Sequence, residues 1–435
     1  MVRTQTMRLA AVLLALSAAT GAAAKESVLY SFPAHGINAS GANPSAGLVA
    51  GPDGNLYGTT ASGGNSNCNC GTVFQLAPPA AGQTAWTQTV LYSFQGYPND
   101  GQQPRASLVL DSQGNIYGTT LLGGASQSGT VFMLQNGGSG IWTETVLHQF
   151  DGTDGQLPFD TLTLDGAGSL YGTTSLGGGA NQGTLFKLQV ASVNSTLTVL
   201  HDFTGGKDGG QPYSGLIFDA SGNLYGTTSS DGLTDAVGGT VFQLAPGGTE
   251  TVLHTFTDIT DRCCKKNGGL FKQDGGFPYG NLTFDTAGNL YGTTVFGCTS
   301  SGGGAVFKLA PPAAGESEWT ETLPHCFVGN SNLNPHVDGS SPMGGVLIDA
   351  AGNLYGTLEG GGTIGFGAVY KIAPPAPGKK DWKETLLLSF NEANGAGPFG
   401  SLIADTQGNL YGTTNTGTDL GPNARQIGTV FRLTP

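Results

Sequence analysis

Five aspartates occupy one place in a repeated Asp-Gly-x-x-Pro motif, where they could hold a cation or grip a polar ligand. The five are Asp100, Asp154, Asp208, Asp274 and Asp338. Carboxylate oxygens are the ligands that Ca²⁺ prefers, so a ring of them around one opening would suit a calcium ion. The same motif is typical of a turn in which Asp accepts backbone amides and Pro fixes φ. We favour the turn, and a calcium ion at an axial opening is the one cofactor that the sequence suggests.

Six cysteines form the second reactive group. They are Cys68, Cys70, Cys263, Cys264, Cys298 and Cys326. An even number of cysteines in an exported chain indicates disulfides, whose pairing a sequence leaves open. We expect the last four to form two bridges that hold the longest loop, and the first two to be bonded to each other or free. A metal site is the alternative, but no Cys-x-x-Cys pair with a histidine partner is present.

Histidine and tryptophan recur at fixed places in a Thr-Val-Leu-x-x-Phe segment. One position holds a histidine in four copies and a tyrosine or leucine in three: His148, His201, His254, His325, Tyr30, Tyr92 and Leu388. A position that accepts Tyr or Leu favours packing over catalysis. Tryptophans begin four of these segments, namely Trp86, Trp142, Trp319 and Trp382. They could stack on sugars, but we expect them to pack at an outer rim.

The elements that must position these residues come from one repeat, Asp-x-x-Gly-Asn-Leu-Tyr-Gly-Thr-Thr. Its seven tyrosines are Tyr57, Tyr117, Tyr171, Tyr225, Tyr291, Tyr355 and Tyr411. Successive tyrosines are 54 to 66 residues apart. A recurring unit of this size is typical of propellers and solenoids.

Each unit contains four candidate strands, which in the second unit are residues 107–110, 116–120, 129–134 and the segment that ends at Phe150. A turn that begins at Asp111 joins the first two, and we expect its aspartate to accept backbone amides. The second strand has a glycine at its centre, such as Gly118. A glycine there in every copy suggests close approach by a neighbouring sheet.

The two ends of the chain complement each other. Residues 27–32 form a fourth-type strand without the preceding three, and the chain finishes with three strands that lack a fourth. The N-terminal strand can therefore complete the last set and remove a free sheet edge. We predict an all-β fold, a seven-bladed β-propeller with four antiparallel strands per blade, over residues 25–435. An open solenoid is the alternative, and it would need polar capping repeats.

Three linked motifs, Gly-Asn-Leu-Tyr-Gly-Thr-Thr, Gly-Thr-Val-Phe-x-Leu and Thr-Val-Leu-x-x-Phe, resemble the GloVer (Gloeo/Verruco) tandem repeat of bacterial proteins. The resemblance covers residues 27–434. It implies an exported protein of unassigned activity, often held at the surface by a C-terminal sorting segment. It supplies no catalytic residues.

Residues 1–24 have the features of a secretory signal peptide. Arg3 and Arg8 precede the apolar run 9–19, and small residues 22–24 provide a cleavage site. The formal net charge is −13, which argues against nucleic acid and anionic membranes as partners. We expect a secreted or periplasmic monomer with no membrane span after removal of the signal.

The leading functional hypothesis is a non-enzymatic binding module that presents its variable loop face to a protein, glycan or small polar ligand. We expect the longest loops, residues 257–279 and 328–343, to be at its centre. The sequence contains no nucleophile elbow, phosphate loop or zinc-binding helix motif, so we predict no catalytic residue. The alternative is an extracellular hydrolase or lyase that uses acidic residues at the channel mouth, because propellers host unrelated chemistries.

Overall fold

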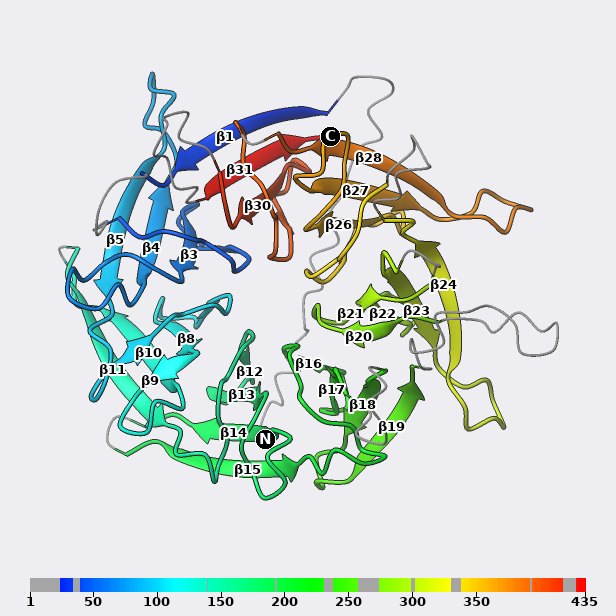
Figure 1. Cartoon of the computed structure of the whole chain (residues 1–435), viewed down its shortest axis with the longest axis horizontal. Coiled ribbons are helices and arrows are strands. Elements are labelled where there is room, and N and C mark those ends of the chain that lie inside the picture. Colours follow the sequence, from blue (N-terminus) through cyan, green and yellow to red (C-terminus); the bar gives the residue numbers. More distant parts are fainter. Residues whose placement is uncertain are drawn as a thin grey trace, which may run out of the picture.

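Seven four-stranded antiparallel sheets form a ring in this computed structural model (Figure 1). The structure describes residues 24–33, 40–138, 140–191, 194–230, 238–256, 274–298, 302–329, 338–391, 393–417 and 428–435. These residues contain no helix, and hence none that could cross a membrane. The predicted all-β, seven-bladed propeller is confirmed.

The strands run from the axis outward within each blade (Figure 1). Blade 1 contains β2 (Val49–Ala50), β3 (Leu56–Thr60), β4 (Thr72–Ala77) and β5 (Thr87–Ser93); blade 2 contains β7 (Val109–Leu110), β8 (Ile116–Thr120), β10 (Thr130–Asn136) and β11 (Trp142–Gln149). Blade 3 contains β12 (Thr163–Leu164), β13 (Ser169–Thr174), β14 (Thr184–Gln189) and β15 (Thr196–Asp202); blade 4 contains β16 (Ile217–Phe218), β17 (Leu224–Thr228), β18 (Thr240–Leu244) and β19 (Glu250–Thr255). Blade 5 contains β21 (Thr283–Phe284), β22 (Leu290–Phe296), β23 (Ala305–Ala310) and β24 (Thr320–Cys326); blade 6 contains β25 (Leu347–Ile348), β26 (Leu354–Leu358), β27 (Ala368–Ala373) and β28 (Lys383–Ser389). Blade 7 contains β29 (Ile403–Ala404), β30 (Leu410–Thr414), β31 (Thr429–Thr434) and β1 (Lys25–Ser31).

The N-terminal strand completes the last blade, as predicted. β1 runs antiparallel to β31, with Val28 opposite Phe431 (Figure 1). It covers the edge of β31 that an open array would leave exposed. A side-chain hydrogen bond joins blade 7 to blade 1 near the axis, where Thr413 Oγ1 donates to the Ala46 carbonyl at 2.7 Å. The seventh blade therefore contacts the first as any two neighbours do.

A phenylalanine of the third strand covers the glycine at the centre of the second. Gly58 lies opposite Phe74, and a Cβ on Gly58 would be 2.7 Å from Phe74 Cζ. The expectation that a neighbouring sheet needs this glycine was wrong, because the ring belongs to the same sheet. An aromatic side chain lying across a strand glycine is a known device for stabilising sheets.

The other side of that phenylalanine contacts the next blade. Phe32 of blade 7 meets Phe74 of blade 1 with ring centroids 5.3 Å apart. Equivalent ring pairs occur at all seven junctions, with centroids 5.0–5.3 Å apart and interplanar angles of 56–70°: Phe32–Phe74, Phe94–Phe132, Phe150–Phe186, Phe203–Phe242, Phe256–Phe307, Phe327–Tyr370 and Phe390–Phe431. Such inclined pairs contribute about 0.5–1.5 kcal/mol each beyond area burial.

The innermost strand is shorter than predicted. Residues 107–110 were expected to pair, but only Val109 and Leu110 join the ladder. The preceding backbone bonds to the neighbouring blade instead, because Thr59 Oγ1 donates to the Ala106 carbonyl at 3.1 Å. Threonines of the second strand thus tie adjacent blades together near the axis.

The turn between the first and second strands has the structure that the sequence predicted. Asp111 Oδ1 accepts the amides of Gln113 and Asn115, both at 2.9 Å. Asp111 Oδ2 accepts the Tyr117 hydroxyl at 3.1 Å, which fixes the repeat tyrosine. In blade 1, where Gly51 replaces this aspartate, Asp53 accepts the Tyr57 hydroxyl at 2.9 Å.

Two sets of loops share one face of the ring. The connection that enters each blade pairs with the loop between its second and third strands. In blade 2 this pairing forms β6 (Gly101–Gln102) and β9 (Leu122–Gly123), and in blade 5 it joins β20 (Gly276–Pro278) to β22. In the remaining blades it is a single bridge: Ala42–Ser62, Gln156–Leu176, Gly210–Ser230, Ser340–Gly360 and Ala396–Thr416.

Blade 6 departs from the phenylalanine pattern in a way that predicts a stabilising substitution. Tyr370 is fully buried, and its hydroxyl has no hydrogen-bond partner among the described residues. An unsatisfied buried hydroxyl costs about 1–3 kcal/mol, so Tyr370→Phe should raise the free energy of unfolding by about this amount. Chemical denaturation measures the change. Phe307→Tyr at the same place in blade 5 should have the opposite effect, and a Tyr370→Phe protein no more stable than the wild type would contradict the assignment.

Candidate functional site

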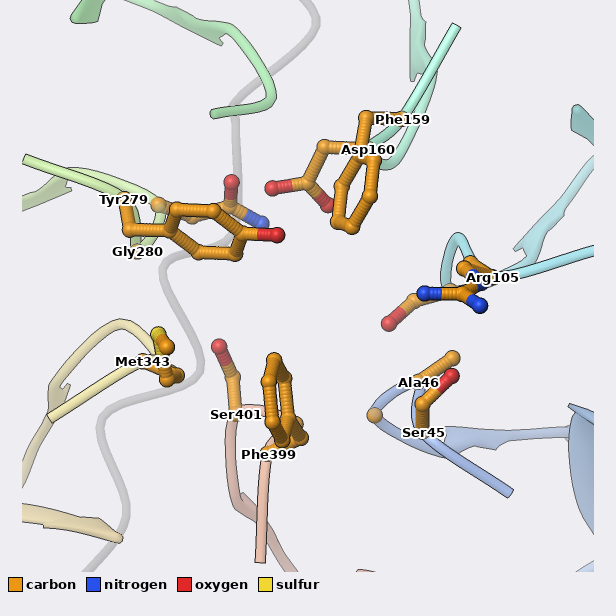
Figure 2. A pocket seen from close by; sticks show the side chains of 15 residues that line it. Ser45, Ala46, Arg105, Phe159, Asp160, Tyr279, Gly280, Met343, Phe399 and Ser401 are labelled. Atoms are coloured by element: carbon orange, nitrogen blue, oxygen red, sulfur yellow. The ribbon is translucent and has the colours of Figure 1, made fainter. Parts of the chain in front are cut away.

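One residue from each blade stands at the axial opening, directly after the proline of the entering loop. The seven are Ser45, Arg105, Phe159, Tyr213, Tyr279, Met343 and Phe399. Six of them line one cavity (Figure 2). The seventh, Tyr213, stacks on Tyr279. This ring is the candidate site.

A contact between proline and glycine places these residues. A Cβ on Gly71, at the start of the third strand of blade 1, would lie 2.6 Å from Cδ of Pro104, which leads into blade 2. Gly71 also has a φ of +97°, a conformation that glycine adopts without strain. The proline therefore seats on the preceding blade, and the residue after it lies at the axis.

Aromatic rings from blades 3 to 5 form one wall of the site. Tyr213 and Tyr279 are stacked with centroids 5.2 Å apart, and Phe159 meets the edge of each at 5.4 Å. The wall continues outward through Phe277, 6.2 Å from Tyr279, to Phe296, 5.9 Å from Phe277. Phe296 is 43% exposed, so the five rings reach from the axis to the surface of blade 5. We call these five residues the aromatic band.

Polar groups from blades 7, 1 and 2 line the opposite wall, which comprises Asn415, Asn43, Ser45, Ser62 and Arg105. Figure 2 shows Arg105 on the side of the cavity opposite Tyr279. The space here is about 210 Å³, and it adjoins a space of about 50 Å³ beside Tyr279. Phe159, Phe399, Ser45 and Arg105 border both spaces.

A single carboxylate, Asp160, lines the described cavity. Its Oδ1 accepts the Thr161 amide at 2.5 Å and the Thr161 hydroxyl at 2.9 Å, and its Oδ2 accepts the Gly215 amide at 3.1 Å. Burial nevertheless raises the pKa of this carboxyl. Burial also raises the pKa of the Tyr279 hydroxyl, with a further contribution from the Asp160 charge. Both groups therefore favour their neutral forms more than they would in water.

The structure does not bring the five motif aspartates together. Each lies beside the outermost strand of the blade that precedes its loop, against a tyrosine or histidine, in the pairs Tyr92–Asp100, His148–Asp154, His201–Asp208, His254–Asp274 and His325–Asp338. Four also accept amides that close the loop, from Gln95 to Asp100, from Asp151 to Asp154, from Thr204 to Asp208 and from Val328 to Asp338. None of the five lines the axial cavity. The hypothesis that they ring the channel mouth was wrong, because their carboxylates close the loops instead.

Glutamates of the next blade face some of these aspartates. Burial, with a contribution from the Asp100 charge, raises the pKa of Glu144 to about 8. Burial and the Asp208 charge raise the pKa of Glu250 to about 7 in the same way. The blade junctions thus contain carboxyl groups that titrate near neutral pH.

The cysteines are partly paired as expected. Cys68 is bonded to Cys70, and Cys298 to Cys326. The second bond lies within blade 5, so neither of its cysteines holds the long loop, contrary to our expectation. Cys263 and Cys264 lie outside the described residues, as do residues 257–273 and 330–337 of the two loops expected to centre the binding face.

The histidines and tryptophans have packing contacts. Each of the four histidine rings meets the phenylalanine two residues later at 4.7–4.9 Å. Trp319 packs against Tyr225 of the preceding blade at 6.5 Å, and Trp86, Trp142 and Trp382 lie against the other blade clusters. The tryptophans are therefore part of the blade junctions.

Sequence reasoning missed the residues at the axis. A signal was available, since the position after the proline of each entering loop varies between copies while the proline itself does not. It contains three aromatic residues, Phe159, Tyr213 and Tyr279, in succession. In a repeat protein, a variable residue that is directed to the axis can determine which ligand is bound.

The repeat seen in the sequence matches a family model described as the Gloeobacter/Verrucomicrobia repeat, over residues 12–195, 142–325 and 272–435, which confirms the resemblance inferred from its motifs. No curated protein matches the sequence. The fold is similar to that of PorZ, an essential bacterial surface component of the type-IX secretion system of Porphyromonas gingivalis, at 12% identity and a TM-score of 0.52, covering 90% of this chain and 46% of PorZ. A putative oxidoreductase (glucose dehydrogenase) from Thermus thermophilus is 16% identical with a TM-score of 0.44, covering 76% of this chain and 96% of its own. The likeness to PorZ supports the fold alone.

The raised pKa of Glu144 predicts that stability depends on pH. The folded pKa of about 8 lies above the ordinary value of 4.5. The stability that the protonated Glu144 carboxyl contributes is therefore full below about pH 4.5 and is lost as the pH rises through 8. Glu144→Gln, which cannot ionise, should flatten the decline in the free energy of unfolding over this range. Denaturation at a series of pH values measures the effect. Glu318→Gln, at an exposed site, is the control, and an unchanged pH profile for Glu144→Gln would contradict the prediction.

Proposed function

We propose that this chain, which belongs to the Gloeobacter/Verrucomicrobia repeat family, binds a carbohydrate in its axial cavity. One observation carries the proposal. The cavity has an aromatic wall on one side and a hydrogen-bonding wall on the other. This arrangement refines the broader hypothesis of a loop-face binding module.

The aromatic wall suits the apolar face of a sugar ring. A pyranose presents C–H groups on its faces and hydroxyls around its edge, so its faces pack well on flat aromatic side chains. Tyr213 and Tyr279 supply stacked rings. The Tyr279 hydroxyl adds a polar group at the edge of the wall (Figure 2). Phe159 closes the wall toward blade 3. Ligand sites commonly combine such apolar surface with a few placed polar groups.

The opposite wall suits the hydroxyls. Arg105 can donate five hydrogen bonds, and the amides of Asn43 and Asn415 both donate and accept. A purely apolar ligand would leave these groups without partners, which costs binding energy. A ligand that is apolar on its faces and hydroxylated at its edge satisfies both walls. A strongly anionic polymer is disfavoured by the net charge of −13.

The dimensions of the cavity favour binding of the end of a sugar chain over binding of its middle. The two adjoining spaces, about 210 and 50 Å³, accept a single small ring at the axis. The aromatic band then continues outward to the exposed Phe296, where further sugar units of the same chain can lie. An oligosaccharide should therefore bind with one end at the axis.

Binding is better supported than hydrolysis. Glycosidases place two carboxyl groups on either side of the scissile bond. The described lining of the axial cavity contributes one, Asp160, whose oxygens already accept three hydrogen bonds. Its role in this proposal is to hold the junction of blades 3 and 4 and to accept a sugar hydroxyl.

The same proposal includes export from the cytoplasm. Disulfides persist mainly in oxidising compartments, and the described residues contain two. An exported propeller is placed where it can meet glycans outside the cell membrane. N-terminal sequencing of the protein isolated from whole cells tests this part of the proposal, and retention of residues 1–24 would count against it.

Isothermal titration of residues 25–435 with a panel of neutral oligosaccharides tests the site. Tyr279→Ala should weaken binding at least tenfold, about 1.4 kcal/mol, because it removes the centre of the aromatic wall. Tyr279→Phe keeps the ring and should weaken binding less than Tyr279→Ala does, since it removes at most one neutral hydrogen bond, which contributes about 0.5–1.5 kcal/mol.

Ile364→Ala is the matched control, because Ile364 is 57% exposed in a loop of the same face but does not line the cavity. It should bind as the wild type does. The proposal fails if no oligosaccharide binds, or if Tyr279→Ala binds as tightly as Ile364→Ala.

A further inference from the structure

A cluster of potential metal ligands lies away from the axis, at the junction of blades 4 and 5. It consists of His254 on β19, Asp274 just before β20, and Glu321 on β24. One ligand atom from each residue lies within 4.8 Å of the others. Among the described residues this is the only place where three such atoms converge.

The separations fit a bound divalent ion. His254 Nε2 is 3.3 Å from Asp274 Oδ2 and 3.8 Å from Glu321 Oε1. Nitrogen and oxygen ligands bind zinc at about 2.0–2.2 Å, which places two ligands of a tetrahedral site about 3.4 Å apart. The three side chains are only 17%, 10% and 11% exposed, so the ligands are already largely shielded from water.

Other blades provide an internal comparison. His148 Nε2 lies 2.7 Å from Asp154 Oδ2, and His325 Nε2 lies 3.0 Å from Asp338 Oδ2, both as hydrogen bonds. His254 Nε2 is buried and, within the described part of the chain, has no hydrogen-bond partner. His201 Nε2 in blade 3 is likewise buried without a hydrogen-bond partner, 3.3 Å from Asp208 Oδ2, but among the described histidines of this position only His254 also has a second carboxylate within 4 Å, that of Glu321. A buried nitrogen without a partner is costly unless something binds it.

We propose that His254, Asp274 and Glu321 bind one divalent transition metal ion, for which Zn²⁺ is the probe. An imidazole together with two carboxylates suits zinc and its neighbours better than Ca²⁺ or Mg²⁺, which prefer oxygen alone. Three protein ligands leave a fourth position for water.

The ion would have a structural role at this junction. His254 and Asp274 stand at the two ends of the longest connection between blades, and Glu321 belongs to the outer strand of the next blade. Metal binding therefore joins both ends of this connection to blade 5. It also fixes the start of β20, which carries Phe277 of the aromatic band. This inference does not depend on the proposed carbohydrate function.

Titration of chelator-treated protein, residues 25–435, with Zn²⁺ tests the site. We expect one ion per chain by calorimetry, and a rise in melting temperature on the order of 3 °C at saturating zinc. Glu321→Gln and His254→Gln should each weaken zinc binding by more than the roughly 10–100-fold typical of losing a supporting residue. His201→Gln and Glu250→Gln change the same residue types at the junction of blades 3 and 4, and they should leave zinc binding unchanged.

Cobalt substitution provides a second readout that does not require the variants to fold. Co²⁺ in a tetrahedral site of one nitrogen and oxygens should give visible d–d bands without thiolate charge transfer. The proposal is overturned if the wild-type protein binds no zinc, if the variants bind it as tightly as the wild type, or if cobalt shows thiolate charge transfer, which would assign the metal to cysteines.

Discussion

The inclined contact between phenylalanines of neighbouring blades is the interaction on which this structure depends. In each pair the third-strand ring lies over a glycine of its own sheet and meets the fourth-strand ring of the adjacent blade at 5.0–5.3 Å. The glycine lets the ring lie flat, and the flat ring sets the spacing and tilt between blades. Repeated seven times, one local geometry closes the ring and leaves β1 beside β31.

Closure of the ring with seven blades creates the candidate site. Each Asp-Gly-x-x-Pro loop crosses from the outer strand to the axis, its aspartate held at the outside and its proline seated on a glycine of the preceding blade. The residue after the proline has no structural partner imposed by the repeat, so its type can vary. Phe159, Tyr213 and Tyr279 become neighbours because three successive blades present aromatic residues there. The repeated positions determine the scaffold, and the variable residue after the proline determines the chemistry of the axial cavity.

Much of the scaffold is predictable from the sequence because it follows from positions that do not vary. The aspartate turn, the number of blades and the joining of the two ends each depend on a motif whose spacing is visible along the chain. The axial residues are different, because nothing local distinguishes Tyr213 from an exposed loop tyrosine until the ring is closed. The direction of the motif aspartates was equally hidden, since a turn of the same sequence could direct its carboxylate to the axis or to the outer strand. The pairing of Cys298 with Cys326 likewise depends on the distance between two strand ends of blade 5.

A crystal structure of the protein soaked with its tightest-binding oligosaccharide tests the central claim most directly, because it locates the ligand on the ring. The account predicts density for one sugar ring against Tyr213 and Tyr279 at the axis, with hydroxyls within hydrogen-bond distance of Arg105 or Asp160. Sugar bound instead at the rim, beside Trp86 or Trp142, with only water at the axis, would contradict it.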